Sequence, residues 1–134
     1  MQKVKETTDK HLVFVADSDG INTVFLMLVE RLKDDRLYGE HLTLLYVSDN
    51  YGFVFKEELD ILTKRFPTRF LTCYESSHRQ ETLEAIINTN TKKQMEFHLD
   101  LAEEERHSIC SELHFLGIDN RNIHIITHQL YQNN

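Results

Sequence analysis

Short apolar segments alternate with amphipathic segments along almost the whole chain, and this alternation restricts the fold more than any other feature. Apolar runs of strand length occupy residues 11–16, 41–48, 69–74, 94–101 and 122–127. Such runs are typical of strands buried on both faces of a parallel sheet. Strands that alternate with helices form such sheets, with helices on both faces. The sequence therefore predicts an α/β, Rossmann-like three-layer sandwich with a five-stranded parallel sheet.

The segments between these runs have helical spacing. Helices are predicted at 21–32, 55–66 and 103–117, with a shorter one that begins after Ser76 or Ser77 and ends at Ile87. In the first, apolar residues recur every three or four positions and form one face. Pro67 ends the second helix, and Gly117 is a natural C-terminal stop for the last.

Composition places the chain among ordinary globular proteins and excludes some partners. Its 134 residues suit one domain, which we assign to 11–131 with a polar extension at 1–10. The net charge of −7 argues against nucleic acid and anionic membranes as partners. No apolar run is long enough to span a bilayer, and no signal segment is evident. We therefore expect a cytoplasmic protein in which Cys73 and Cys110 are free thiols.

The turn after the first strand is the first place to look for a ligand, because open α/β sheets bind ligands beyond the carboxyl ends of their strands. It reads ADSDGINT. The free amides at a helix N-terminus attract anions, so those of Gly20, Ile21, Asn22 and Thr23 could hold a phosphate. The carboxylates Asp17 and Asp19 would repel it unless a cation intervened. The alternative is that Asp19 or Ser18 caps the helix and no ligand binds.

Four segments resemble the NAD(P)-binding domain of the ferredoxin-NADP reductase family. DSDGINTVFLMLVERL is similar to the turn and helix of the family pattern G-G-T-G-I-T-P, with Gly20 and Ile21 at the G-I pair and Asn22 and Thr23 at the T-P positions. LTLLYVSDNYGFVFKEEL and FPTRFLTCYES resemble the strands and helix that follow, and ICSELHFLGIDNRNIHI resembles the last helix and strand. The resemblance extends from His11 to Tyr131.

The resemblance implies binding of NAD(H) or NADP(H) and hydride transfer to a flavin. It places the pyrophosphate at Gly20, Ile21, Asn22 and Thr23, the ribose at Ser48 and Asp49, and the nicotinamide near Asp100. The family holds FAD in a preceding β-barrel domain, which ten residues before His11 cannot form. FAD would therefore come from a domain missing from this chain or from a partner domain or subunit, and an active protein would be an NAD(P)H-dependent oxidoreductase.

Two family motifs are altered in this chain. Asp17 and Ser18 replace the first two glycines of the turn, and LDLA stands at 99–102 where the family has C-G-P. No Arg or Lys cluster follows Ser48, which favours NADH over NADPH. These changes predict weak or undetectable binding, and they leave open a non-catalytic interaction or regulatory domain on the same fold.

Two further hypotheses come from short patterns. VFVADSDG matches the hhhhDxDG motif of haloacid-dehalogenase-type phosphatases, in which Asp17 would be the nucleophile and Asp19 the acid-base beside Mg²⁺. His107, Cys110 and His114 lie along one side of a helix and could bind zinc. We interpret these three as satisfied residues that border the core and predict no metal site. We interpret His124 and His128 as structural residues at a strand end.

Overall fold

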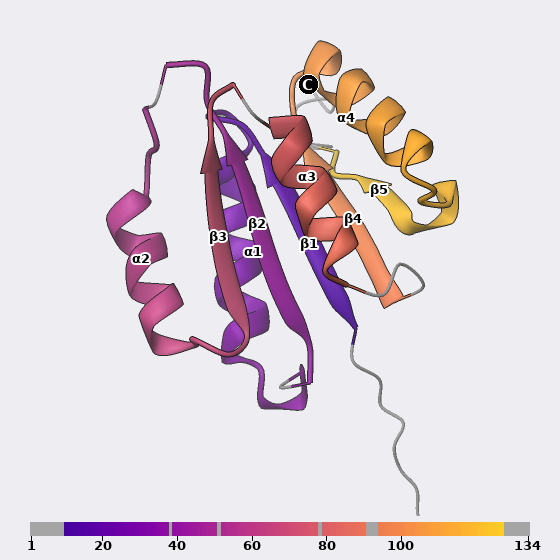
Figure 1. The fold of residues 1–134 in the computed structure, drawn as a ribbon. Coiled ribbons are helices and arrows are strands. Elements are labelled where there is room, and N and C mark those ends of the chain that lie inside the picture. The colour runs from indigo at the N-terminus through magenta and orange to yellow at the C-terminus, as the bar shows by residue number, and fades with distance from the viewer. Residues whose placement is uncertain (1–9, 38, 51, 78, 91–93, 128–134) are drawn as a thin grey trace, which may run out of the picture.

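A computed structural model describes residues 10–37, 39–50, 52–77, 79–90 and 94–127 (Figure 1). The predicted polar extension at 1–10 lies outside this part of the chain except for Lys10, and so does His128. The elements are β1 (His11–Ala16), α1 (Ile21–Lys33), the 3-10 helix η1 (Asp35–Leu37), β2 (His41–Val47), α2 (Lys56–Arg65), β3 (Phe70–Glu75), α3 (Arg79–Asn88), β4 (Met95–Asp100), α4 (Glu103–Phe115), the 3-10 helix η3 (Asn120–Asn122) and β5 (Ile123–Ile125).

The five strands form one parallel sheet in the order β3-β2-β1-β4-β5. β1 is central and pairs with β2 on one side and β4 on the other. The strand order changes direction at β1, so the carboxyl ends of β1, β2 and β4 form the crevice where such sheets bind ligands. The predicted fold class is confirmed.

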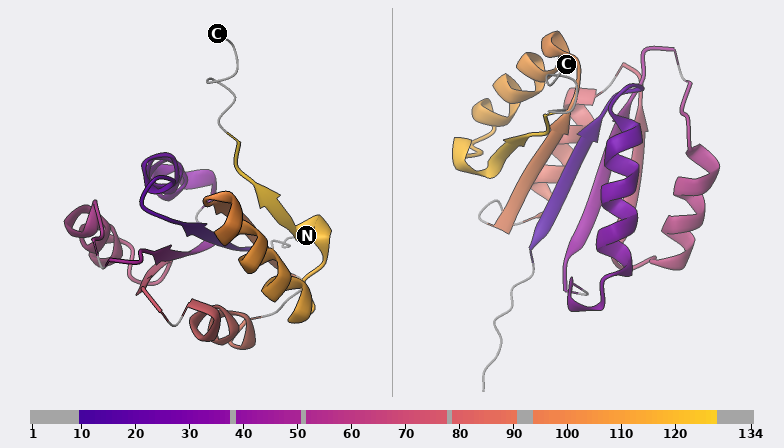
Figure 2. Two further views of the ribbon diagram at one scale, coloured as in Figure 1. Left: turned by 90° about the horizontal axis from the view of Figure 1, so that it is seen from above. Right: turned by 180° about the vertical axis from the view of Figure 1, so that it is seen from behind.

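The sheet separates two apolar cores. α1 and α2 pack on the face that carries Leu12, Phe14 and Ala16 of β1, whereas α3 and α4 pack on the face that carries Val13 and Val15. Figure 2 shows α1 on one side of the sheet and α3 and α4 on the other. This alternation follows from the period of two in strand side chains.

The helices begin and end close to the predicted positions. Ile21, Val24, Leu28 and Leu32 of α1 are all buried, as their spacing predicted. After α4 the chain turns at Gly117, which has a φ of 93°, a conformation that glycine adopts at little energetic cost. The amide of Ile118 donates to the carbonyl oxygen of Leu113 at 2.9 Å and closes this helix end.

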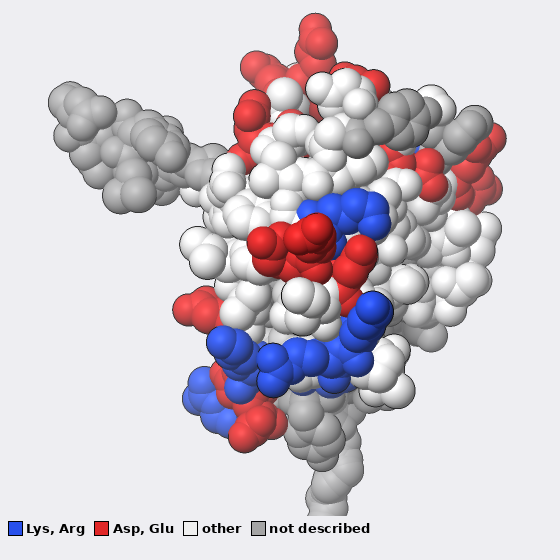
Figure 3. All heavy atoms as spheres, turned by 90° about the vertical axis from the view of Figure 1, so that its left-hand side faces the viewer, with Lys and Arg blue, Asp and Glu red and all other residues white. Residues whose placement is uncertain are grey.

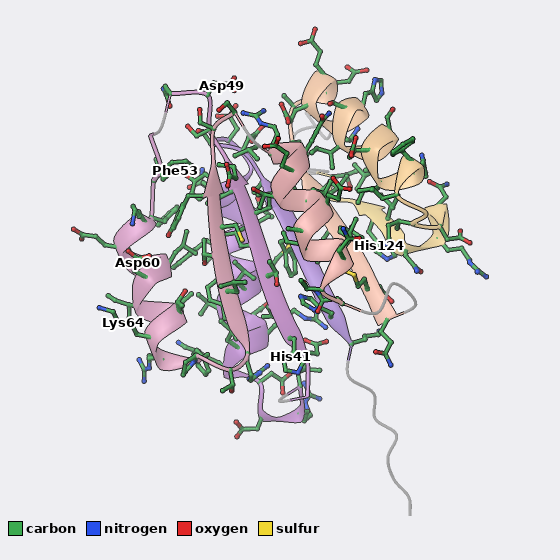
Figure 4. The ribbon with its side chains drawn as sticks, viewed as in Figure 1. His41, Asp49, Phe53, Asp60, Lys64 and His124 are labelled. Carbon is green, nitrogen blue, oxygen red and sulfur yellow. The ribbon has the colours of Figure 1, made fainter. Side chains whose placement is uncertain are left out.

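α2 is attached to the β3 edge of the sheet through aromatic side chains. Phe53 makes edge-to-face contacts with Tyr46 and Tyr74, with ring centroids 5.0 and 5.1 Å apart. The Tyr74 hydroxyl donates to Asp60 at 3.1 Å. Figure 4 shows Phe53 and Asp60 on the side of the molecule that α2 occupies.

None of the described helices is long and apolar enough to cross a membrane. Cys73 and Cys110 are both free thiols, as expected.

Candidate functional site

Asp17 organises the turn between β1 and α1. One of its carboxylate oxygens accepts hydrogen bonds from the backbone amides of Asp19 (3.1 Å) and Gly20 (2.8 Å). The other accepts from the amide of Ala102 at 2.9 Å. An aspartate commonly takes up the amides two or three residues further on. These hydrogen bonds connect the turn after β1 to the start of α4.

The prediction that Asp19 or Ser18 caps α1 is wrong. The N-cap position belongs to Gly20, and no side chain hydrogen-bonds the helix from there. The physical reason is that Asp17 orders this turn instead. Its carboxylate accepts hydrogen bonds from the amides of Asp19 and Gly20, and its carbonyl oxygen accepts one from the amide of Ile21 at 3.0 Å. Asp19 itself is exposed.

Gly20 is required because the turn passes directly against β4. A Cβ atom at Gly20 would lie 2.1 Å from the carbonyl oxygen of Asp100. The amide of Asp17 also approaches this carbonyl, at 3.4 Å. The one glycine that matches the family turn is therefore also the residue that allows β1 and β4 to end side by side.

A pocket of about 380 Å³ opens at the carboxyl ends of the central strands. The turns after β1 and β2, the start of α3 and the start of α4 surround it. It is lined by Asp17, Ser18, Asp19, Val47, Ser48, Asp49, Asn50, Arg79, Ala102, Glu104 and Glu105. Its size is within the range of small-molecule sites, and its position is the crevice that the topology predicts.

The pocket is strongly acidic. Among the described residues that line it, five are carboxylates, namely Asp17, Asp19, Asp49, Glu104 and Glu105, and one, Arg79, is a cation. In Figure 3, Asp and Glu side chains crowd the upper end of the molecule, where the strands finish, and most of the Lys and Arg side chains in view lie lower. This charge distribution opposes the entry of an anion.

Arg79 is held in the pocket by acceptors on three sides. Its guanidinium donates to Asp49 at 2.8 Å, to Glu105 at 2.5 Å and to the carbonyl oxygen of Ser76 at 2.5 Å. Burial alone would lower the pKa of Arg79, but the hydrogen bonds to Glu105 and Asp49 outweigh it and raise that pKa. Only 17% of the side chain is exposed. Arg79 is thus a fixed, fully charged group.

The sequence-predicted residues divide into two groups. Ser48 and Asp49 line the pocket. The Ser48 hydroxyl is buried and lies 2.8 Å from the side-chain oxygen of Asn50, so it orders its own loop, whereas Asp49 projects at the upper end of the molecule (Figure 4).

The other five predicted residues border the pocket without lining it. Gly20, Ile21 and Asp100 are buried behind the turn, whereas Asn22 and Thr23 are accessible in the first turn of α1. Within the described residues, no backbone acceptor from the preceding turn reaches the amides of Asn22 and Thr23. A binding role for these residues stays a prediction.

Arg79 and Glu105 were not predicted from the sequence as pocket residues. No Arg or Lys cluster follows Ser48, whereas Arg79 follows the next strand and reaches Asp49, which is 30 positions away in the sequence. The signal that was available is that β3 ends at the same edge of the sheet, so residues after it can reach the pocket.

The helical trio His107, Cys110 and His114 does not form a converging set of ligands in the described part of the chain. His114 instead lies 3.2 Å from the side-chain oxygen of Asn120, beyond the end of α4.

Solved structures that share this fold include a ferredoxin-NADP+ reductase, a flavohemoglobin and a flavohem-like FAD/NAD binding domain. Ferredoxin-NADP+ reductase from Plasmodium falciparum superposes with a TM-score of 0.71 at 16% identity, over 90% of this chain and 52% of that chain. Flavohemoglobin from Malassezia yamatoensis, solved with bound FAD and heme, gives 0.71 at 16% identity over 90% and 32%. The flavohem-like FAD/NAD binding domain of nitric oxide dioxygenase from Vibrio cholerae gives 0.65 at 16% identity over 92% and 53%. No protein-family model and no curated protein matches the sequence.

The chain therefore has the fold of a domain found in ferredoxin reductase-like proteins. The resemblance predicted from the sequence is confirmed at the level of the fold. The chain spans about half the length of ferredoxin-NADP+ reductase and about a third of flavohemoglobin.

Proposed function

We propose that the chain is a nicotinamide-dinucleotide-binding module of a ferredoxin reductase-like flavin oxidoreductase, with weakened affinity for the dinucleotide. The observation that carries the proposal is the pocket at the carboxyl ends of β1, β2 and β4, directly beside the Gly20 turn. Its place in the fold is where doubly wound sheets bind nucleotides.

The dinucleotide would lie along the first turn of α1. The unpaired amides at Asn22 and Thr23 suit a pyrophosphate oxygen. Asp49, in the pocket wall, suits a ribose hydroxyl, which donates to a carboxylate. Asp100 lies behind the turn, on the side where the nicotinamide would end.

Weak affinity follows from the charges. A pyrophosphate would enter among five carboxylates, and Arg79 is already shared between Asp49 and Glu105. The additional phosphate of NADPH would have to displace those carboxylates from Arg79. We therefore propose that NADH binds better than NADPH.

Calorimetric titration with NADH and NADPH tests the proposal. We expect a dissociation constant of about 0.1 mM or weaker for NADH, and weaker binding still for NADPH. Amide NMR shifts on NADH addition should fall at residues 17–23 and 48–50. Micromolar NADPH binding contradicts the weakened, NADH-preferring pocket, and NADH shifts confined to other surfaces contradict the site.

We further propose that a flavin domain or subunit is the partner, because the chain spans only part of the reductase-like proteins it matches. The acidic pocket also favours a second candidate, an interaction module that has lost the ligand. That candidate predicts no NADH-dependent NMR shift at millimolar nucleotide, whereas the first predicts a saturable one.

A phosphatase is less well supported. Both carboxylate oxygens of Asp17 accept hydrogen bonds from backbone amides, which lowers their reactivity as nucleophiles. In addition, α1 begins directly at Ile21, which leaves no flap between the motif and the helix. We expect no hydrolysis of an aryl phosphate with Mg²⁺. Activity that is lost in Asp17→Asn would reverse this conclusion.

A further inference from the structure

Three potential metal ligands converge on one face of the sheet, over β4 and the edge strand β5, away from the pocket. Glu96 and His98 are two residues apart on β4 and therefore project from the same face. His124 is the β5 residue paired with His98 in the strand register. Neighbouring strands lie about 4.8 Å apart, so the three side chains form a compact triangle.

Their ligand atoms are close enough for one ion. One nitrogen from each histidine and one carboxylate oxygen all lie within 4.8 Å of one another. Nε2 of His124 is 3.3 Å from Oε1 of Glu96. Tetrahedral zinc bonds of about 2.0–2.1 Å hold ligand atoms about 3.3 Å apart. One pair already has this separation, and the third ligand atom lies within 4.8 Å of both.

The surroundings orient His98. Its ring stacks between Phe14, at 5.0 Å, and His124, at 4.8 Å between centroids. This packing holds the ring of His98 beside that of His124.

The charged neighbours leave one carboxylate oxygen of Glu96 facing the histidines. Arg31 is engaged by Glu40 at 2.6 Å, so this pair is close to neutral. Lys10 lies 3.6 Å from Oε2 of Glu96, the oxygen that does not face His124. The Oε1 atom of Glu96 therefore remains on the side of the histidines.

The triangle is open to solvent. The His124 side chain is 44% exposed and that of Glu96 is 30% exposed. α1 passes over β1, and the rear view in Figure 2 shows no helix among the described elements in front of β5. Figure 4 places His124 on β5, at the opposite edge of the sheet from α2. An ion can reach the site directly and keep a water ligand.

We propose that Glu96, His98 and His124 bind one divalent zinc-like ion. Two imidazoles and a carboxylate are a ligand set that zinc accepts, with water in the fourth position. The ion would cross-link β4 to β5, a strand of only three residues at the sheet edge. Metal binding would then stabilise the fold by mass action.

The test uses the full chain without an affinity tag, after removal of metal with EDTA. Calorimetry with Zn²⁺ should give one ion per chain with a dissociation constant of about 10 µM or tighter. Co²⁺ should give the visible absorption of a tetrahedral site, and Zn²⁺ should raise the thermal unfolding midpoint. Absence of zinc binding at about 1 mM overturns the proposal.

Matched variants locate the ion. Glu96→Gln and His124→Gln should each weaken zinc binding at least tenfold while circular dichroism shows the fold retained, because both side chains are partly exposed. The control is His107→Gln on α4, which should bind zinc like the parent. Binding that is lost in His107→Gln, or kept in both Glu96→Gln and His124→Gln, overturns the assignment.

Discussion

At the scale of single residues, the Asp17 carboxylate connects two segments that are 85 positions apart in the sequence. It satisfies amides of its own turn and the amide of Ala102 at the start of α4. The residue that most alters the family's glycine-rich turn therefore has a structural task. Replacing it with glycine to restore the family motif would remove that task together with the charge.

We predict that Asp17→Ala lowers the free energy of unfolding by about 1–3 kcal/mol, because it leaves several amides without their acceptor. Asp19→Ala, at an exposed position two residues away, should change it by less than about 0.5 kcal/mol. Urea denaturation of both variants checks this difference. Equal losses in the two variants would show that Asp17 does not hold the turn.

Gly20 is the second residue whose replacement should be costly. Gly20→Ala places a Cβ 2.1 Å from a backbone oxygen, so we predict a loss of about 2–3 kcal/mol or more. Gly39→Ala is the control, since in the described part of the chain no atom other than those of its sequence neighbours lies within 4 Å of the added Cβ. Thermal or urea unfolding of the two variants provides the comparison, and a Gly20→Ala protein as stable as Gly39→Ala contradicts the close approach.

At the scale of elements, α2 begins from an unusual backbone conformation. Phe55, directly before the helix, has a φ of 70°, which costs a residue with a Cβ about 1–2 kcal/mol. Its ring stacks on Phe25 of α1 with centroids 4.7 Å apart. Aromatic packing between two helices thus offsets the backbone strain.

We predict that Phe55→Gly is more stable than Phe55→Ala by about 1 kcal/mol, because both lose the stack but only glycine relieves the backbone. Both should be less stable than the parent. Urea denaturation of the three proteins gives the order directly. An alanine variant as stable as the glycine variant would mean that the positive φ is not maintained in solution.

The elements themselves could be predicted because their signals are local. The apolar runs and helical faces correspond to strands and helices within a few residues. The site depends on contacts between distant segments, which periodicity does not reveal. Arg79 reaches Asp49 only because β3 lies beside β2, and His124 meets His98 only because β5 pairs with β4 in that register. The sequence alone therefore did not reveal that Arg79 reaches the pocket or that His124 lies beside His98.

At the scale of the whole molecule, the fold provides a crevice for a ligand, whereas the charge of the pocket opposes an anionic one. The topology builds a crevice of the kind in which doubly wound sheets bind ligands, whereas the described residues around it carry five carboxylates and one cation that is already paired. We propose that the crevice remains a dinucleotide site whose affinity these charges limit.

Removing pocket charges without disturbing Asp17 tests that claim most directly. The variant Asp19→Asn/Glu104→Gln neutralises two exposed pocket residues. The control Glu30→Gln/Asp35→Asn makes the same change in net charge at exposed positions toward the end of α1 and beyond it. Each unit charge near a solvated pyrophosphate costs about 1 kcal/mol. Calorimetric titration with NADH should therefore show roughly tenfold to hundredfold tighter binding by the pocket variant and little change in the control. A folded pocket variant that binds NADH no better than the control would contradict the account.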